Sequence, residues 1–264
     1  MSLQIGLSGA LGRMGAAVGA VIGETADMTL RVVFDRPETQ SSTAMGLPLT
    51  DLDAALRQCG VVIDFSTPAA GVTLAAKAAG AGGPALVIGA TGFSAEQDAA
   101  VAEASKHIAI VKAGNYAIGV NILAGVVEET ARRLGPELWD IEVFEAHHRR
   151  KVDAPSGTAL MLAHAAARGR GRSLADLRTP QREGVTGQRA LGSIGMSVMR
   201  GGGIIGEHSV VFAADEETLT FSHTAMDRGL FARGAVAAAR WVAGRPPGLY
   251  DMMDVLGFRG VNPT

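Results

Sequence analysis

The sequence predicts an α/β protein in two parts, a doubly wound parallel sheet in the first half and a smaller α+β part in the second. Between residues 3 and 111, short apolar stretches alternate with Ala-rich stretches, as in parallel strands joined by helices. Loops of small residues follow the apolar stretches. Beyond Tyr116, a long amphipathic stretch precedes alternating polar and apolar residues, which is typical of a mostly antiparallel sheet carrying helices.

The composition is that of a globular protein with a formal net charge of −2. Its 264 residues are enough for two modest domains. The single cysteine, Cys59, excludes an intramolecular disulfide and fits a reducing compartment. The chain begins directly with a strand pattern, and no apolar run reaches the roughly eighteen residues of a membrane span. We therefore expect a soluble, cytoplasmic protein with no membrane partner.

The first expected strand, Leu3 to Leu7, leads into a turn with glycine at every third position and then into an Ala/Val-rich helix. This spacing is a variant of the dinucleotide fingerprint, in which glycines allow a tight turn and close approach of a pyrophosphate. The second expected strand, 28–34, ends at Asp35 and Arg36. An acidic residue here would bind a ribose 2′-hydroxyl, whereas Arg36 would suit a 2′-phosphate, so the choice between NADH and NADPH stays open. The alternative is that Asp35, Arg36 and Pro37 form an ordinary turn.

The remaining parallel strands are expected at 60–64, 84–88 and 108–111, with helices at 69–81 and 94–105. Ligands of such a sheet lie beyond the carboxyl ends of its strands. Four small-residue loops fall there, and together they predict a cofactor cleft. These loops are Gly9, Ala10, Leu11, Gly12, Arg13 and Met14; Phe65 to Thr67; Gly89, Ala90 and Thr91; and Ala113, Gly114, Asn115 and Tyr116.

In the second half, helices are expected at 119–134, 158–168 and 231–243, and strands at 138–145, 194–200, 206–212 and 217–223. An irregular segment at 169–192 and a packed tail at 250–256 complete the chain. The segment Arg200 to Gly203 is either a flexible turn or a binding loop, and the residues alone do not decide which.

The centre of the second half is the stretch Glu145 to Ala159. Two histidines and three cations lie between His147 and Lys151, and a Pro-Ser-Gly-Thr turn then opens a helix capped by Ser156 or Gly157. A cationic loop beside a helix N-terminus suits a small dianion. We expect a carboxylate to bind at Ser156, Gly157 and Thr158, while Lys151 and either His147 or His148 supply charge and protons.

Three other interpretations of this stretch are weaker. A solvated basic face or a nucleic-acid patch is disfavoured, because the whole chain is slightly acidic and no second basic stretch flanks this one. Zinc is disfavoured because neighbouring histidines on a strand point to opposite faces and no cysteine or carboxylate completes a set. A nucleophilic Ser156 lacks the surrounding nucleophile-elbow pattern. We expect neither a metal nor a nucleic-acid partner.

The residues Glu145 to His148 and Lys151 to Ala159 closely resemble the signature of the 4-hydroxy-tetrahydrodipicolinate (dihydrodipicolinate) reductase family. The resemblance runs nearly end to end. The other matching segments are Gly9 to Gly15, Asp64 to Pro68, Gly89 to Gly92, Asn115 with Gly119 to Asn121, Arg182 to Gly184 with Thr186 and Gly187, Gly206 to His208, and Tyr250 to Leu256.

The resemblance implies a Rossmann domain over 1–117, completed by 228–264, and a substrate-binding and oligomerisation domain over 118–227 whose sheet builds a homotetramer. It implies hydride transfer from NADH or NADPH to a cyclic imine dicarboxylate, with loss of water, in lysine and diaminopimelate biosynthesis. By position, His147 is similar to the family's proton donor/acceptor and Lys151 to its proton donor. Other matched positions are the substrate contacts His148, Gly157 and Thr158, and the cofactor contacts Gly9 to Met14, Asp35, Arg36, Gly89 to Thr91, and Ala113 to Tyr116.

Three positions depart from the family's usual pattern: Ala90, Tyr116 and Arg150. The first two are expected to line the nicotinamide side, so cofactor preference could differ, whereas Arg150 adds charge only. Two alternative functions stay open, an NAD(P)-dependent oxidoreductase acting on another small imine or dicarboxylate, and a nucleotide-sensing regulatory module. The intact His147, His148 and Lys151 argue against the sensor, since a sensor needs no proton donor.

Overall fold

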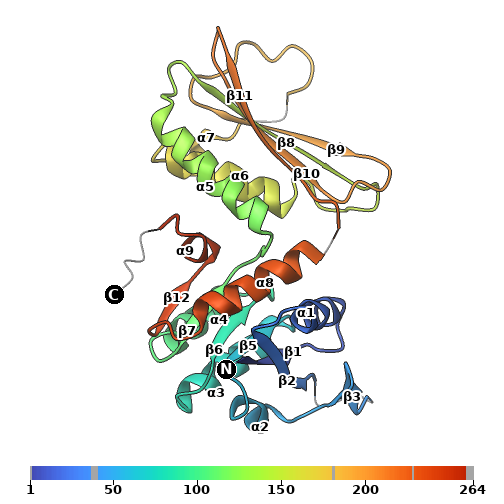
Figure 1. Ribbon diagram of the computed structural model, residues 1–264. Helices are drawn as coiled ribbons and strands as arrows, with labels where there is room; N and C mark the ends of the chain where they lie inside the picture. Colours follow the sequence, from blue (N-terminus) through green and yellow to red (C-terminus); the bar gives the residue numbers. More distant parts are fainter. Residues whose placement is uncertain (1, 37–40, 180–181, 228, 260–264) are drawn as a thin grey trace. The chain divides into compact units, whose positions relative to one another are not determined.

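A computed structural model describes residues 2–36, 41–179, 182–227 and 229–259 (Figure 1). The chain forms two compact units, one of Met1–Ile118 with Gly229–Thr264 and the other of Gly119–Arg228. The chain therefore leaves the first unit once and returns to it. Each unit has its own hydrophobic core, and each is described by itself.

The first unit is built on a six-stranded sheet in which every pairing is parallel. Its strand order is β12-β7-β6-β5-β1-β2. The strands are β1 (Leu3–Ser8), β2 (Met28–Phe34), β5 (Val61–Asp64), β6 (Ala85–Ile88), β7 (Ala109–Lys112) and β12 (Gly248–Tyr250). The predicted doubly wound sheet is confirmed.

Helices cover both faces of this sheet because alternate residues of its short strands are buried on opposite sides. On one face, α1 (Arg13–Gly23) and α8 (Gly229–Val242) pack against residues such as Ile63 and Val87. On the other face, α2 (Leu52–Leu56), α3 (Pro68–Gly80) and α4 (Ala95–Ala104) pack against Val62 and Leu86.

Several short elements of this unit were not predicted from the sequence. They are a small hairpin of β3 (Thr43–Ala44) and β4 (Leu47–Pro48), the helix α2, the edge strand β12 and the helix α9 (Met252–Val255). The tail was expected only to be packed, and Met252 is indeed 1% exposed. Asp251 caps α9, and its side chain accepts hydrogen bonds from the backbone of Met253 and Asp254.

The second unit is a four-stranded sheet, ordered β11-β10-β8-β9, with helices on one face (Figure 1). Its strands are β8 (Asp140–His147), β9 (Ile194–Arg200), β10 (Glu207–Ala213) and β11 (Thr218–Thr224), and its helices are α5 (Ile118–Arg133), α6 (Gly157–Gly169) and α7 (Leu174–Leu177). Strand β8 is antiparallel to β10 but parallel to β9, so the sheet is mixed. The segment expected to be irregular contains α7, which Ser173 caps.

The helix-covered face of this sheet is apolar near its middle and polar at the end where β8 finishes. Val143, Val210 and Phe212 pack against α6, whereas Glu145 and His147 continue the same face of β8. The opposite face carries Phe144 and Met199, which are 37% and 48% exposed. No described helix in either unit is long and apolar enough to cross a membrane.

Candidate active site

The first candidate surface lies at the carboxyl ends of the parallel strands in the first unit. The chain runs outward in both directions from β1, to β2 on one side and to β5 on the other, which is where such sheets bind nucleotides. Gly9 follows β1 with φ +72°, and a Cβ there would lie 2.7 Å from the carbonyl oxygen of Phe65. A Cβ on Gly15 would lie 2.3 Å from the carbonyl oxygen of Gly9. The glycine spacing therefore packs the loop tightly against α1 and against the neighbouring loop.

The N-terminus of α1 fits a phosphate-bearing cofactor. Helices α2, α3, α4 and α6 are capped by the side chains of Asp51, Thr67, Ser94 and Ser156. The cap of α1 is Gly12, which has no side chain, and Leu11, Gly12 and Arg13 are exposed. The first N–H groups of α1 therefore receive no side-chain cap, as expected where an anion binds.

Asp35 ties this loop to the end of β2. One carboxylate oxygen accepts the Leu11 N–H at 2.9 Å, and the other accepts the Arg36 N–H at 2.8 Å. The Asp35 side chain is 10% exposed, whereas that of Arg36 is 79% exposed and its Nε lies 3.9 Å from Asp35. The guanidinium of Arg36 is thus accessible to a ligand.

The loops after β6 and β7 show which expected contacts are accessible. Thr91 and Gly114 are exposed, whereas Ala90 is 8% exposed. Tyr116 is a core side chain, 2% exposed, with its hydroxyl 2.9 Å from the Ile88 carbonyl oxygen and 3.1 Å from that of Val111. Burial raises the pKa of this phenol. The sequence predicts Tyr116 on the nicotinamide side, and within this unit its ring and hydroxyl are buried in the core.

Asp64, at the end of β5, organises the loop between the two glycine-rich turns. Its Oδ1 accepts the N–H of Ser66 at 3.2 Å and the hydroxyl of Ser66 at 2.5 Å. The loop that follows Asp64 packs closely against the loop after β6, because a Cβ on Gly89 would lie 2.3 Å from the Phe65 ring. Burial raises the pKa of Asp64, which is 0% exposed. The sequence marked this residue only as part of a matching segment and missed its positioning role.

The second candidate surface lies in the second unit, where β8 leads through a loop into α6. Ser156 is the N-cap of α6, and its Oγ accepts the N–H of Ala159 at 3.1 Å. Gly157 is exposed as the first residue of the helix. The turn that precedes it contains a cis peptide bond between Ala154 and Pro155. The expected anion-binding turn is therefore a helix N-terminus with Ser156 as its N-cap and an exposed first residue, Gly157.

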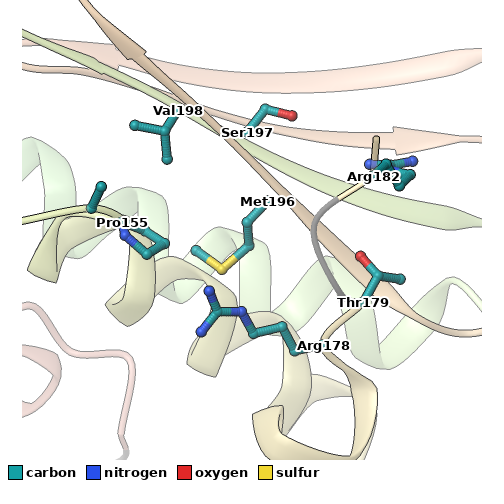
Figure 2. A pocket seen from close by; sticks show the side chains of 8 residues that line it. Pro155, Arg178, Thr179, Arg182, Met196, Ser197 and Val198 are labelled. Atoms are coloured by element: carbon teal, nitrogen blue, oxygen red, sulfur yellow. The ribbon is translucent and has the colours of Figure 1, made fainter. Parts of the chain in front are cut away.

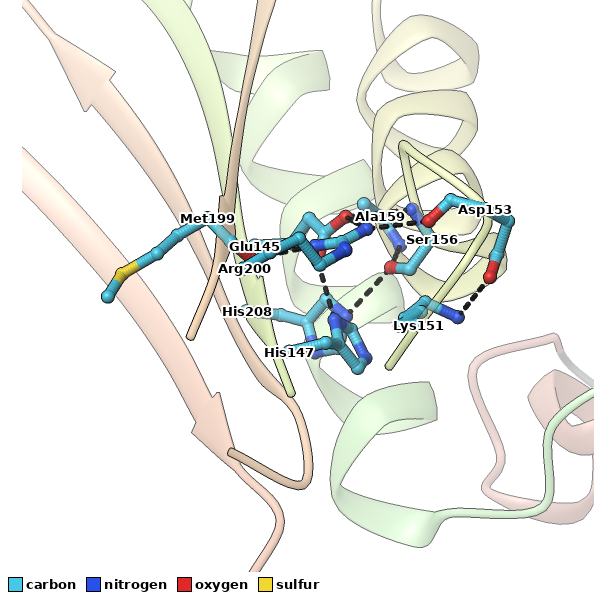
Figure 3. Close-up of polar contacts among 9 residues, drawn as sticks. All are labelled: Glu145, His147, Lys151, Asp153, Ser156, Ala159, Met199, Arg200 and His208. Atoms are coloured by element: carbon cyan, nitrogen blue, oxygen red, sulfur yellow. Dashed lines mark hydrogen bonds and ion pairs between the residues drawn. The ribbon is translucent and has the colours of Figure 1, made fainter. Parts of the chain in front are cut away.

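His147 is joined to Glu145, two residues earlier on the same face of β8 (Figure 3). Its Nδ1 lies 2.5 Å from Oε2 of Glu145, and the two residues are 9% and 1% exposed. Burial disfavours the carboxylate of Glu145, but hydrogen bonds from Arg200, His147 and Ser156 outweigh it and hold its pKa below the ordinary value. Glu145 is therefore a buried carboxylate, and it orients the imidazole of His147.

Arg200, the last residue of β9, pairs with both oxygens of Glu145, at 2.8 and 2.9 Å. The same guanidinium donates to the carbonyl oxygen of Asp153 at 2.6 Å. Hydrogen bonding to Glu145 raises the pKa of Arg200. One cation thus contacts both the strand that carries His147 and the loop that leads into α6.

His208 lies beside His147, with ring centroids 5.1 Å apart in an edge-to-face arrangement. Its Nε2 is 3.1 Å from Oγ of Ser156. Burial, followed by the proximity of His147, lowers the pKa of His208 to about 4. His208 is therefore a neutral ring at ordinary pH.

Lys151 projects from the loop between these elements. Its Nζ lies 2.8 Å from Oδ1 of Asp153, and its side chain is 21% exposed. This contact holds the pKa of Asp153 below its ordinary value. Its neighbour His148 has a buried Nδ1 that finds no hydrogen-bond partner within the described chain. The loop thus offers an accessible cation and an unused imidazole nitrogen.

A separate cavity of about 460 Å³ lies behind the turn that precedes α6 (Figure 2). Pro155 forms one wall, Met196 and Val198 of β9 form another, and Arg178 and Arg182 contribute cations. Neither His147 nor Lys151 lines it. The sequence did not predict this cavity.

Comparison with known proteins identifies the family. The dihydrodipicolinate reductase N-terminus matches residues 3–116, and the dihydrodipicolinate reductase C-terminus matches residues 119–256. The 4-hydroxy-tetrahydrodipicolinate reductase of Caulobacter vibrioides is 56% identical over 257 residues, 97% of this chain and 98% of that protein. The chain belongs to the dihydrodipicolinate reductase family.

Two further relatives of this family support the assignment. The 4-hydroxy-tetrahydrodipicolinate reductase of Rhizobium rhizogenes is 49% identical over 268 residues, 97% of each chain. A dipicolinate-bound dihydrodipicolinate reductase from Paenisporosarcina sp. TG-14 has the same fold, with a TM-score of 0.80 at 21% identity over 96% of this chain and 99% of that one. Membership of the dihydrodipicolinate reductase family confirms the predicted resemblance, and with it an NAD(P)H-dependent oxidoreductase.

The structure gathers three residues around His147 to which the sequence gave no role: Glu145, Arg200 and His208. A signal for Glu145 was present, because a residue two positions before His147 on a strand shares its face. Arg200 and His208 come from other strands, and no local pattern connects them to His147.

Proposed function

We propose that this protein reduces 4-hydroxy-tetrahydrodipicolinate to tetrahydrodipicolinate, with loss of water, in lysine and diaminopimelate biosynthesis, using NADH or NADPH. The observation that carries the proposal is the loop between β8 and α6, which combines a buried imidazole, a partly exposed lysine and a helix N-terminus whose first residue is exposed. This set suits a ring that bears two carboxylates and must receive a proton. Family membership and the dipicolinate bound to the solved relative support the same substrate class.

The first unit would hold the dinucleotide. The glycine loop and the open N-terminus of α1 suit the pyrophosphate, and Asp35 and Arg36 suit the ribose end. The bound nicotinamide would supply the hydride. The other proposed contacts are Gly89, Ala90, Thr91, Ala113, Gly114 and Asn115, together with the backbone of Tyr116.

The second unit would bind the dicarboxylate. The N–H groups at the start of α6, at Gly157 and Thr158, suit one carboxylate, and Ser156 fixes their direction as the N-cap. Lys151 and His148 are partly exposed polar groups of the same loop. A substrate carboxylate would compete with Asp153 for the ammonium of Lys151.

Proton delivery is assigned to His147 and Lys151. Because Nδ1 of His147 is bonded to Glu145, its Nε2 is the nitrogen that remains to exchange a proton. Lys151 is a second donor and places positive charge where negative charge develops. A positioned proton donor contributes about 10²–10⁴-fold to rate, so both residues are worth testing separately.

The assembly and the location belong to the same proposal. The exposed face of the second unit's sheet, with Phe144 and Met199, is proposed as the surface through which a homotetramer forms. A cytoplasmic location fits a biosynthetic enzyme with a single cysteine. Neither a nucleic-acid partner nor a resident metal is part of the proposed function.

The test is the fall in nicotinamide absorbance with purified protein, NADH or NADPH, and substrate made in place by the preceding synthase from pyruvate and aspartate semialdehyde. We expect oxidation that requires the synthase and that dipicolinate inhibits. Nucleotide binding without oxidation would reject the proposed substrate and favour another imine or a sensor.

A further inference from the structure

We propose that Arg200 is a positioning residue for the reaction, which fixes His147 through Glu145 and fixes the loop of Lys151 through the backbone of Asp153. Its kinetic consequences rest on the proposed function, whereas its structural consequences do not. Arg200 begins the Arg200 to Gly203 segment, whose role the sequence left undecided. The contacts around it are drawn in Figure 3.

The carboxylate of Glu145 is saturated with hydrogen bonds. Oε1 accepts from Arg200 and from the N–H of Ser156, and Oε2 accepts from Arg200 and from Nδ1 of His147. An ionised carboxylate offers about four acceptor positions, and all of them are used here. The group therefore has no freedom to rotate, and it holds both His147 and the cap of α6.

The hydrogen bond to Glu145 also fixes which nitrogen of His147 carries the proton. A carboxylate can only accept, so Nδ1 of His147 carries a proton and Nε2 is the nitrogen that exchanges one. Gly206 keeps the region next to Nε2 open, because a Cβ there would lie 3.1 Å from that nitrogen. Without a fixed carboxylate the neutral ring could take the opposite tautomer, which would remove this lone pair.

Arg200 also links His147 to Lys151. The terminal nitrogens of Arg200 also donate to the carbonyl oxygens of Asp153, at 2.6 Å, and Met199, at 2.7 Å. Asp153 in turn holds Nζ of Lys151 through its side chain. The two proposed proton donors are therefore placed by contacts to a single guanidinium.

The backbone of the same segment adds to this arrangement. The N–H of Gly201 donates to the carbonyl oxygen of His147 at 2.9 Å, and the N–H of Arg149 donates to that of Gly202 at 3.3 Å. The segment Arg200 to Gly203 therefore supports the site. Lysine could not replace Arg200, since its single ammonium offers three donors where both terminal nitrogens of the guanidinium are used.

The experiment compares Arg200→Lys and Arg200→Met with wild type, using Arg168→Gln as the matched control. Arg168 forms an exposed pair with Glu128 on the same unit, so its loss tests the removal of an Arg–Glu pair as such. Arg200→Met leaves Glu145 as an unpaired buried charge, which could prevent folding. The double variant Glu145→Gln with Arg200→Met removes both charges, so it can be measured even if Arg200→Met does not fold.

Two readouts are used. In steady-state kinetics with the synthase-coupled substrate, we expect kcat to fall about 10²-fold in the Arg200 variants and the double variant, with the KM for NADH unchanged. In long-range ¹H–¹⁵N spectra of the histidine rings, we expect wild-type His147 to be protonated at Nδ1, and the folded variants to lose that preference. Arg168→Gln should match wild type in both.

A folded Arg200→Met or double variant with wild-type kcat and an unchanged His147 tautomer would overturn the proposal. If wild type oxidises no cofactor, the proposed function has failed, and the histidine spectra alone then decide the positioning role. A variant that lowers kcat but leaves the tautomer unchanged would also count against it, because the loss would not act through His147.

Discussion

The Oγ of Ser156 lies 3.1 Å from Nε2 of His208 and 3.1 Å from the backbone nitrogen of Ala159. Oγ accepts the Ala159 N–H, and the same hydroxyl is hydrogen-bonded to Nε2 of His208. One hydroxyl therefore caps α6 and partners a buried imidazole.

Replacing Ser156 with Ala should destabilise the second unit more than the loss of a helix cap alone. The cap is worth about 1 kcal/mol, and an unsatisfied buried nitrogen on His208 adds about 1–3 kcal/mol. Ser173→Ala is the control, because Ser173 caps α7 in the same unit through the N–H of Asp176. In urea unfolding, the free energy of unfolding of Ser156→Ala should be well below that of Ser173→Ala. Equal losses would mean that the bond to His208 contributes nothing.

His208 should make the free energy of unfolding depend on pH. Its pKa is lowered from 6.5 to about 4 by burial, so between these values the unfolded chain binds a proton that the folded one does not. The contribution of His208 to the free energy of unfolding, roughly 3 kcal/mol, is therefore fully present above about pH 6.5 and is lost as pH falls through about 4. His208→Gln should flatten the dependence measured by urea unfolding across this range. If the free energy of unfolding varied with pH equally in wild type and His208→Gln, His208 would not be the source of the dependence.

Lys151→Ala should lower kcat by about 10²–10⁴-fold, the range for a positioned proton donor, and leave NADH affinity nearly unchanged. Arg150→Ala is the matched control, because Arg150 is an exposed cation one residue away. Steady-state kinetics and NADH fluorescence titration separate the two effects. A fall mainly in NADH affinity, or an equal loss in Arg150→Ala, would count against a catalytic role for Lys151.

Much of the fold could be predicted because short buried strands leave a strong local signal. β6 is a run of apolar residues between two glycine-rich turns, and β5 is apolar up to Asp64. The glycine spacing after β1 reflects two close backbone approaches. The edge strand β12 has no such signal, since it is three residues long and exists through pairing with Ala109 to Val111. Helix α7 is equally short and rests on its cap at Ser173.

The site residues likewise fall into those that the local sequence reveals and those that it does not. His147, Lys151 and Ser156 fall within one short stretch, so spacing alone brings them together. Arg200 and His208 reach the site through strand pairing, Arg200 opposite His147 and His208 opposite Glu145, and register across a mixed sheet is not written in local sequence. The burial of the Tyr116 ring could not be predicted, because nothing local reveals that its hydroxyl reaches the carbonyl oxygens of Ile88 and Val111.

Arg36→Ala should lower the affinity for NADPH about tenfold and leave that for NADH nearly unchanged, since a guanidinium paired with a phosphate contributes about 1.5 kcal/mol or more. Arg36 is largely exposed, so its loss should not disturb the loop, whereas Asp35 also holds the Leu11 N–H. Arg31→Ala is the control, because Arg31 is an exposed arginine on β2, the strand that precedes Arg36. Fluorescence titration with both cofactors gives the ratio. An unchanged ratio would mean that Arg36 does not select between them.

Gly9→Ala should destabilise the first unit and abolish tight NADH binding. At φ +72° an L-residue costs about 1–2 kcal/mol, and the added Cβ would lie 2.7 Å from the Phe65 carbonyl oxygen, so the backbone must shift. Gly80→Ala is the matched control, because Gly80 ends α3 with nothing within 4 Å of its Cβ position, and alanine there should stabilise by about 0.5 kcal/mol. In urea unfolding, Gly9→Ala should be less stable than wild type and Gly80→Ala slightly more stable. In NADH titration, only Gly9→Ala should lose tight binding. Wild-type binding by Gly9→Ala would show that the close approach of the two loops is not what shapes the cofactor surface.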